Sequence, residues 1–200
     1  GVNALSAWIG LGLSIIFETF GLVPQVKYDP PTPHSQFNWY GHYADGLAGA
    51  PARLSDLLSY FTIWSQVVVG VVMTMLYLNP HRRGKWFQVF RLDAVMMIMV
   101  TGIVYNLLLT EGGKEGWDLV SNTLIHVIVP IVTPVVWIIA GPRGAINLKT
   151  ILLALILPII WAVFALTRGV ILNAYPYPFL NVEANGWVSV LSFIAVIVVV

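Results

Sequence analysis

Long apolar runs dominate the chain, and short stretches rich in polar residues, glycine and proline separate them. A bilayer core about 30 Å thick requires about 20 apolar helical residues per crossing. Six runs approach or exceed this length, although the last is short for a span, and they cover residues 4–23, 54–79, 86–109, 118–140, 149–173 and 186–200. The pattern predicts an all-α, polytopic membrane protein in which residues 1–200 form a single domain of six transmembrane helices.

The second apolar run carries a stripe of polar side chains. Ser55, Ser59, Thr62 and Gln66 follow one another at steps of four, three and four, so on one continuous helix they share a face. A membrane helix turns such a face away from lipid and toward other helices or a polar cavity. The stripe therefore marks a side of this helix that meets something polar.

Composition supports a membrane protein and excludes several kinds of chemistry. The chain is 58% hydrophobic and only 10% charged, whereas soluble domains carry about 25% charged residues. It has no cysteine, which excludes disulfides and thiolate catalysis. No basic run is long enough to indicate nucleic-acid binding, and no cofactor is expected. The first run has no basic segment before it and no small-residue cleavage site, so we interpret it as a span rather than a signal peptide.

The basic residues of the loops predict the orientation. Three of the loops that alternate with the runs would lie on one side of the membrane, namely 24–52, 110–117 and 174–185. The basic residues on this side are Lys27, Arg53 and Lys114. The short loops on the other side hold more basic residues, namely Arg82, Arg83, Lys85, Arg143 and Lys149. By the positive-inside rule both termini are cytoplasmic, and the first set of loops faces outward, in a protein expected in a bacterial plasma membrane.

Several polar residues outside the stripe have simple interpretations. The long loop 24–52 could act as a lid, and its His34, His42 and Asp45 match no metal-ligand spacing, so no metal is expected. Small residues at steps of four in the first run, Ser6, Gly10 and Ser14, indicate close helix packing. Arg91 and Asp93 are expected to pair with other helices or reach the interface rather than bind substrate.

Polar groups concentrate in the predicted outer half of the membrane. At a rise of about 1.5 Å per residue, Thr62 and His126 both lie about 12 Å below the outer ends of their helices. Other polar residues occur at similar or shallower depth on three further helices, namely Thr101, Tyr105, Glu18 and Arg168. This asymmetry favours a polar pocket that opens toward the outer side.

His126 and Thr62 are the candidate catalytic pair. His126 is the only histidine within a predicted span, and a neutral imidazole can take the proton of a hydroxyl at matching depth. The same residues also admit a structural interpretation. A membrane threonine often bonds the carbonyl four residues before it, and a histidine often bridges helices.

Four short patches add a resemblance. YFTIWSQ, LIHVIVP, the GPR turn and TRGVILNAYPYPFL resemble bacterial relatives of the androgen-induced-gene/ADTRP-like family of intramembrane threonine hydrolases. That family's eukaryotic members are six-helix proteins that cleave fatty acid esters of hydroxy fatty acids. The resemblance places the family's threonine at Thr62, after Tyr60-Phe61, and its histidine at His126, four residues after Asn122 and before Pro130.

The combined hypothesis is a lipid ester hydrolase with Thr62 as nucleophile and His126 as base. Candidates for binding substrate or the oxyanion are Asn122, Gln66, Tyr105, Arg168, Glu18, Ser59 and Thr101. Glu18 is also considered as an acid that orients the histidine, and Arg168 as a partner of a substrate carboxylate. The alternatives are a non-catalytic lipid- or sterol-binding membrane protein and a small transporter. The sequence makes no prediction of oligomeric state.

Overall fold

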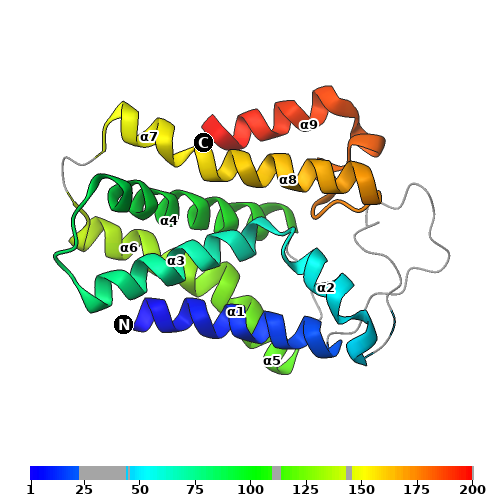
Figure 1. Cartoon of the computed structure of the whole chain (residues 1–200), viewed down its shortest axis with the longest axis horizontal. Helices are drawn as coiled ribbons and strands as arrows, with labels where there is room; N and C mark the ends of the chain where they lie inside the picture. Colours follow the sequence, from blue (N-terminus) through cyan, green and yellow to red (C-terminus); the bar gives the residue numbers. More distant parts are fainter. Residues whose placement is uncertain (23–43, 45, 110–113, 143–145, 200) are drawn as a thin grey trace. The chain divides into compact units, whose positions relative to one another are not determined.

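The computed structural model describes residues 1–22, 44, 46–109, 114–142 and 146–199 (Figure 1). Within these ranges the chain is helical and contains no strand, which confirms the all-α class. The elements are α1 (Val2–Phe20), η1 (Gly46–Gly49), α2 (Ala50–Leu57), α3 (Phe61–Leu78), α4 (Lys85–Val104), η2 (Tyr105–Leu109), α5 (Gly116–Thr123), η3 (Leu124–Ile128), α6 (Val129–Ala140), α7 (Leu148–Ala154), α8 (Ile156–Leu172), η4 (Pro178–Leu180) and α9 (Val182–Val199). Of the short elements, η2 and η3 are π-helical, whereas η1 and η4 are 3₁₀ turns.

Among the described residues, five helical segments are long and apolar enough to cross a membrane: Val2–Phe20, Phe61–Leu78, Lys85–Leu109, Gly116–Ala140 and Leu148–Leu172. The sixth predicted span, 186–200, corresponds to α9. Gly186 interrupts α9 with a φ of 74°, a left-handed conformation that ends regular helix geometry. The count of six spans and the cytoplasmic termini stay predictions.

The described residues group into two compact units. The first unit comprises Gly1–Phe17 and Phe61–Ile159, and the second comprises Glu18–Tyr60 and Ile160–Val200. In the first unit α4 packs beside α3, α6 and α7, and Val69, Ile98 and Val129 are completely buried. In the second unit Leu180 and Val190 are almost or completely buried. The single domain over residues 1–200 stays a prediction.

Small residues hold α1 against the following helices of the first unit, as their spacing predicted. A Cβ atom on Gly10 would lie 2.5 Å from Cγ2 of Ile125 in η3. The hydroxyls of Ser14 and Ser121 are 3.1 Å apart, and Ser121 Oγ donates to the Gly10 carbonyl at 3.1 Å. The packing role predicted for Gly10 and Ser14 is therefore confirmed.

Two glycines of α1 give a matched pair for testing this packing. Gly10→Ala is expected to lower the free energy of unfolding by about 1–3 kcal/mol, because the new methyl group overlaps Ile125. Gly12 has no atom within 4 Å of an added Cβ, so Gly12→Ala is expected to be neutral or stabilising by up to about 1 kcal/mol. Thermal unfolding in detergent compares the two variants, and equal effects would contradict the close approach.

The predicted continuous helix 54–79 differs from the structure, which divides it into α2 and α3. The Ser59 N–H bonds Asp56 O at 2.8 Å, and the Tyr60 N–H bonds Leu57 O at 3.2 Å. These turn-type bonds end α2, and Ser59 Oγ also donates to Asp56 O at 2.6 Å. The polar stripe consequently does not lie on one helix. Thr62 becomes the second residue of α3 rather than a residue in mid-helix.

The predicted helix 149–173 is also divided, into α7 and α8. Pro158 has no N–H for the carbonyl of Ala154, and its ring crowds that carbonyl. The break falls at Leu155, where the Leu155 N–H bonds both Ile151 O and Leu153 O.

Candidate functional site

Thr62 and His126 contact each other within the first unit. Thr62 Oγ1 lies 3.3 Å from His126 Nε2, and Thr62 is only 7% exposed. Thr62 stands in the first turn of α3, and His126 stands in the π-helical η3. The pair that the sequence placed at equal depth is therefore within hydrogen-bond reach.

Asn122 determines which nitrogen of His126 faces the threonine. Its Oδ1 lies 3.0 Å from His126 Nδ1. An amide oxygen only accepts hydrogen bonds, so Nδ1 carries the proton of a neutral ring and Nε2 keeps its lone pair toward Thr62. We expected Asn122 to bind substrate or the oxyanion, whereas the structure places its oxygen where it orients the base.

Tyr105 fixes the plane of the imidazole. Its ring stacks on His126 with centroids 3.6 Å apart and an interplanar angle of 8°. Tyr105 begins η2, so each of the two π-helical segments of the first unit supplies one of the stacked rings. Together with Asn122, this stacking restricts rotation of the ring that must receive the hydroxyl proton.

Pro130 explains why η3 needs donors from other helices. The Val129 N–H bonds Leu124 O, five residues back, so it does not reach Ile125 O. Pro130 has no N–H, so it can donate to neither the His126 carbonyl four residues back nor the Ile125 carbonyl five residues back.

Side chains from two neighbouring elements occupy these two carbonyls. Gln66 Nε2 donates to Ile125 O at 2.8 Å, and Asn106 Nδ2 donates to His126 O at 2.9 Å. Gln66 is completely buried, and its Oε1 has no hydrogen-bond partner among the described residues. These two bonds hold the histidine segment against α3 and η2.

Thr101 supports the nucleophile rather than facing it. Its hydroxyl lies 2.9 Å from Ser65 Oγ, and Ser65 Oγ donates to the Thr62 carbonyl at 2.8 Å. Sequence reasoning did not assign Ser65 or Asn106 to the site. The spacing of three between Thr62 and Ser65 is the signal that could have identified Ser65, because it suits a side-chain bond to the backbone one turn earlier.

Three further candidates, Arg168, Glu18 and Ser59, belong to the second unit. Arg168 forms a buried ion pair with Asp56 and donates to Ala174 O at 3.3 Å. The Glu18 carbonyl accepts from Arg53 Nε at 2.6 Å. Ser59 is fully buried, and its carbonyl accepts from Trp161 Nε1 at 2.9 Å.

Arg53, which the sequence used only to predict orientation, is a central residue of the second unit. It is 3% exposed, and its guanidinium donates to backbone carbonyls that include Ala44 O at 2.8 Å and Gly46 O at 2.6 Å. The three loop residues considered as metal ligands all lie outside the described residues: His34, His42 and Asp45. No group of three or more metal-ligating side chains occurs among those that are described.

The fold and these contacts define a class: an all-helical protein with several helices of membrane-spanning length, compatible with an integral membrane protein. Its first unit carries a threonine in contact with an oriented histidine. Comparison with models of protein families, with curated proteins and with solved structures found no match. The family resemblance carried by the short sequence patches therefore stays a prediction.

Proposed function

We propose that the protein is an intramembrane lipid ester hydrolase that uses Thr62 as nucleophile and His126 as general base. The observation that carries the proposal is the 3.3 Å contact between Thr62 Oγ1 and His126 Nε2, with Asn122 on the opposite ring nitrogen. This is a nucleophile, a base and a group that orients the base. The ester class, fatty acid esters of hydroxy fatty acids or similar lipids, comes from the sequence resemblance.

The contacts support a two-step reaction. The Thr62 hydroxyl gives its proton to His126 Nε2 while its oxygen attacks the ester carbonyl. The tetrahedral intermediate collapses to acyl-Thr62, and the leaving alcohol takes the proton from Nε2–H. Water then gives a proton to Nε2 and attacks the acyl group, and collapse of the second intermediate releases the fatty acid and returns the proton to Thr62.

The position of Thr62 in the first turn of α3 favours the negative charge of both intermediates. The first backbone N–H groups of a helix have no acceptor within the helix, and the N-terminal end of the helix dipole is positive. Such donors stabilise an oxyanion formed beside them. Arg168 is occupied by Asp56 in the second unit, so the proposal assigns no substrate carboxylate to it.

The proposed setting is a bacterial plasma membrane with six spans, cytoplasmic termini and the site toward the outer side. The helices of the first unit support a membrane setting because their outward-facing side chains are apolar. Among them Leu107, Val135 and Ile159 are each at least 45% exposed. Lipid can therefore approach these helices directly.

Covalent labelling tests the pair directly. A fluorophosphonate reacts with hydroxyls that a neighbouring base activates, and we expect it to label Thr62 of the purified chain, as read by peptide mass spectrometry. His126→Ala should abolish the labelling because it removes the proton acceptor. Asn122→Leu should lower the labelling rate about tenfold or more, because the ring loses the acceptor that fixes its tautomer.

Thr74→Ala is the matched control for this experiment. Thr74 also lies on α3, but its hydroxyl donates to Gly70 O at 2.7 Å and accepts from Trp8. This variant should be labelled at Thr62 like the unmodified chain. If His126→Ala folds normally and is still labelled at Thr62, the catalytic pair is refuted. Absence of labelling at Thr62 in the unmodified chain would favour the non-catalytic lipid-binding alternative.

A further inference from the structure

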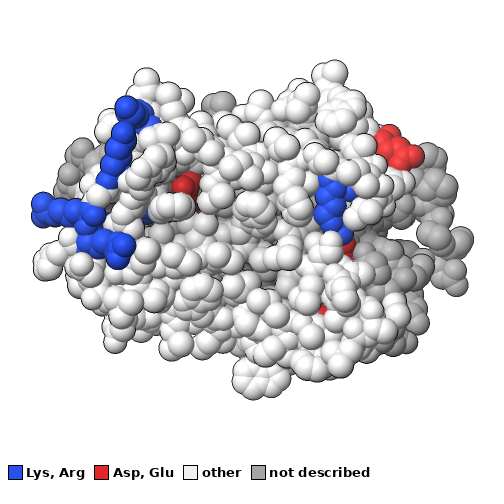
Figure 2. Space-filling model, in the orientation of Figure 1, with Lys and Arg blue, Asp and Glu red and all other residues white. Residues whose placement is uncertain are grey.

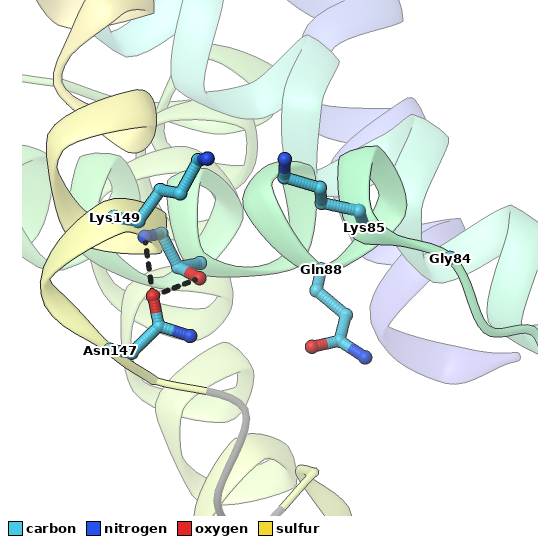
Figure 3. A pocket seen from close by; sticks show the side chains of 6 residues that line it. Gly84, Lys85, Gln88, Asn147 and Lys149 are labelled. Carbon is cyan, nitrogen blue, oxygen red and sulfur yellow. Dashed lines mark hydrogen bonds between the residues drawn. The ribbon is translucent and has the colours of Figure 1, made fainter.

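A surface hollow lies at the ends of two packed helices of the first unit. Its volume is about 350 Å³, and Figure 3 shows the residues around it. One side is formed by the start of α4, with Gly84, Lys85 and Gln88, and the other by the start of α7, with Asn147, Lys149 and Thr150. Below it the two helices pack through Val89, Leu92 and Ala154.

Two cationic side chains converge in this hollow. Figure 3 shows the ammonium ends of Lys85 and Lys149 pointing toward each other from opposite sides. Neither ammonium group has a hydrogen-bond or ion-pair partner among the described residues, and no acidic residue lines the hollow. Two like charges repel, so an anion between them would turn an unfavourable arrangement into a favourable one.

Neutral donors complete the lining. Asn147 Oδ1 accepts from Thr150 N at 3.0 Å and from Thr150 Oγ1 at 3.2 Å, as the dashed lines in Figure 3 show. The Asn147 amide therefore has its Nδ2 left to donate. Gln88 adds a second side-chain amide to the same hollow. A phosphate group, with several acceptor oxygens and negative charge, matches this combination of two ammonium groups and amide donors.

The position of the hollow indicates where such a phosphate would lie. Lys85 begins one candidate membrane span and Lys149 stands at the start of another, and the ends of spans lie at the depth of lipid headgroups. Figure 2 shows a group of blue lysine and arginine side chains at this end, where Figure 1 places the start of α7 and the turn before α4. The exposed Leu152 and Ile156, 57% and 47% accessible, continue away from the headgroup end.

We propose that this hollow, the Lys85–Lys149 site, binds a phosphate group. Two sources carry that chemistry: the headgroup of an anionic glycerophospholipid and a soluble phosphate. The site is separate from the candidate catalytic pair, because the Lys85–Thr101 segment of α4 spans about 24 Å at helical rise. The proposal does not depend on the hydrolase assignment and can stand if that assignment fails.

Lipid binding to the purified full-length chain in detergent tests the site. The chain is titrated with phosphatidylglycerol, and native mass spectrometry reports the fraction that retains lipid. Diacylglycerol with the same acyl chains, which lacks the phosphate, is the ligand control. We expect the double variant Lys85→Gln/Lys149→Gln to bind phosphatidylglycerol about tenfold or more weakly than the unmodified chain, because both charged contacts are lost.

Arg82→Gln/Arg83→Gln is the matched control variant. It removes the same charge from the same end of the first unit, but neither arginine lines the hollow. We expect its affinity for phosphatidylglycerol to stay within about twofold of the unmodified chain. Equal weakening by the two double variants would show general charge attraction and overturn the site. If phosphatidylglycerol binds more tightly than diacylglycerol, unchanged binding by the lysine variant would also overturn it.

A second arm distinguishes the two phosphate sources. Inorganic phosphate and glycerol 3-phosphate are added to the lipid-free chain, and broadening of their ³¹P resonances reports binding. Broadening that disappears in the lysine variant supports the site and shows that it takes soluble phosphate. Retention of phosphatidylglycerol without such broadening supports the site and assigns it to a lipid headgroup. Failure of both ligands to bind refutes the proposal.

Discussion

Thr62→Ala is expected to reduce ester hydrolysis to the background of the assay, a fall in kcat of at least about a thousandfold. Among the described residues, Thr62 Oγ1 is the one side-chain oxygen in contact with His126 Nε2, so the variant cannot form an acyl-enzyme at position 62. Turnover of a fatty acid ester of a hydroxy fatty acid by the purified chain, followed by release of free acid, measures the effect.

The serine variant makes this test specific to the nucleophile. Thr62→Ser keeps the hydroxyl and loses one methyl group, so we expect kcat to stay within about tenfold of the unmodified chain. Thr101→Val, which removes the hydroxyl that contacts Ser65, separates support from chemistry. This variant is expected to lower the thermal unfolding temperature and to leave kcat close to that of the unmodified chain. If Thr62→Ala folds and keeps full turnover, Thr62 is not the nucleophile.

The second large effect is expected in the stability of the second unit. Asp56→Ala should lower the free energy of unfolding by about 3–5 kcal/mol, because it leaves the Arg168 guanidinium buried without its counter-ion. Both side chains of this pair are less than a tenth exposed. Thermal or denaturant unfolding in detergent, followed by tryptophan fluorescence, provides the measurement.

An exposed pair supplies the control for burial. Lys114 and Asp118 are 3.4 Å apart with side chains 30% and 29% exposed, and Asp118→Ala should cost no more than about 1 kcal/mol. Arg168→Met removes the buried positive charge, and residue 168 then no longer needs the Asp56 carboxylate as its counter-ion. It is therefore expected to interact with Asp56→Ala, with the double variant less damaged than the sum of the single variants. Strict additivity would contradict a direct interaction.

The lengths of the apolar runs predicted where helices occur more reliably than where those helices break. Apolar runs locate α1, the segment formed by α4 and η2, and the end of α3 within a few residues, because a membrane span requires a nearly continuous apolar sequence. The break at Ser59 escaped prediction because serine and tyrosine at that point continue an amphipathic pattern. The break has a local part, the bonds from Ser59 and Tyr60 to carbonyls three residues back, and a tertiary part that the pattern does not contain, the bond from Trp161 Nε1 to the Ser59 carbonyl.

The candidate site also has a part that the sequence predicts and a part that it does not. Helical rise places Thr62 and His126 at comparable depth, and the spacing of four between Asn122 and His126 suits a contact along one helix. The roles of Gln66 and Asn106 could not be predicted, because they depend on the two carbonyls that η3 and Pro130 leave open. A proline in the sequence predicts a lost bond but does not identify the side chain that replaces it.

The π-helical η3 also decides which way the two ends of its helix face. In a regular α-helix, the twelve-residue step from Ser121 to Thr133 turns the side chain by about 120° from its starting direction, at about 100° per residue. A π turn accommodates one additional residue, so the net rotation falls to about 20°. Ser121 and Thr133 can then both bond α1, through Ser14 at 3.1 Å and Asn3 at 3.0 Å. The extra residue thus lets one helix dock along α1 at both ends while His126, between them, turns toward α3.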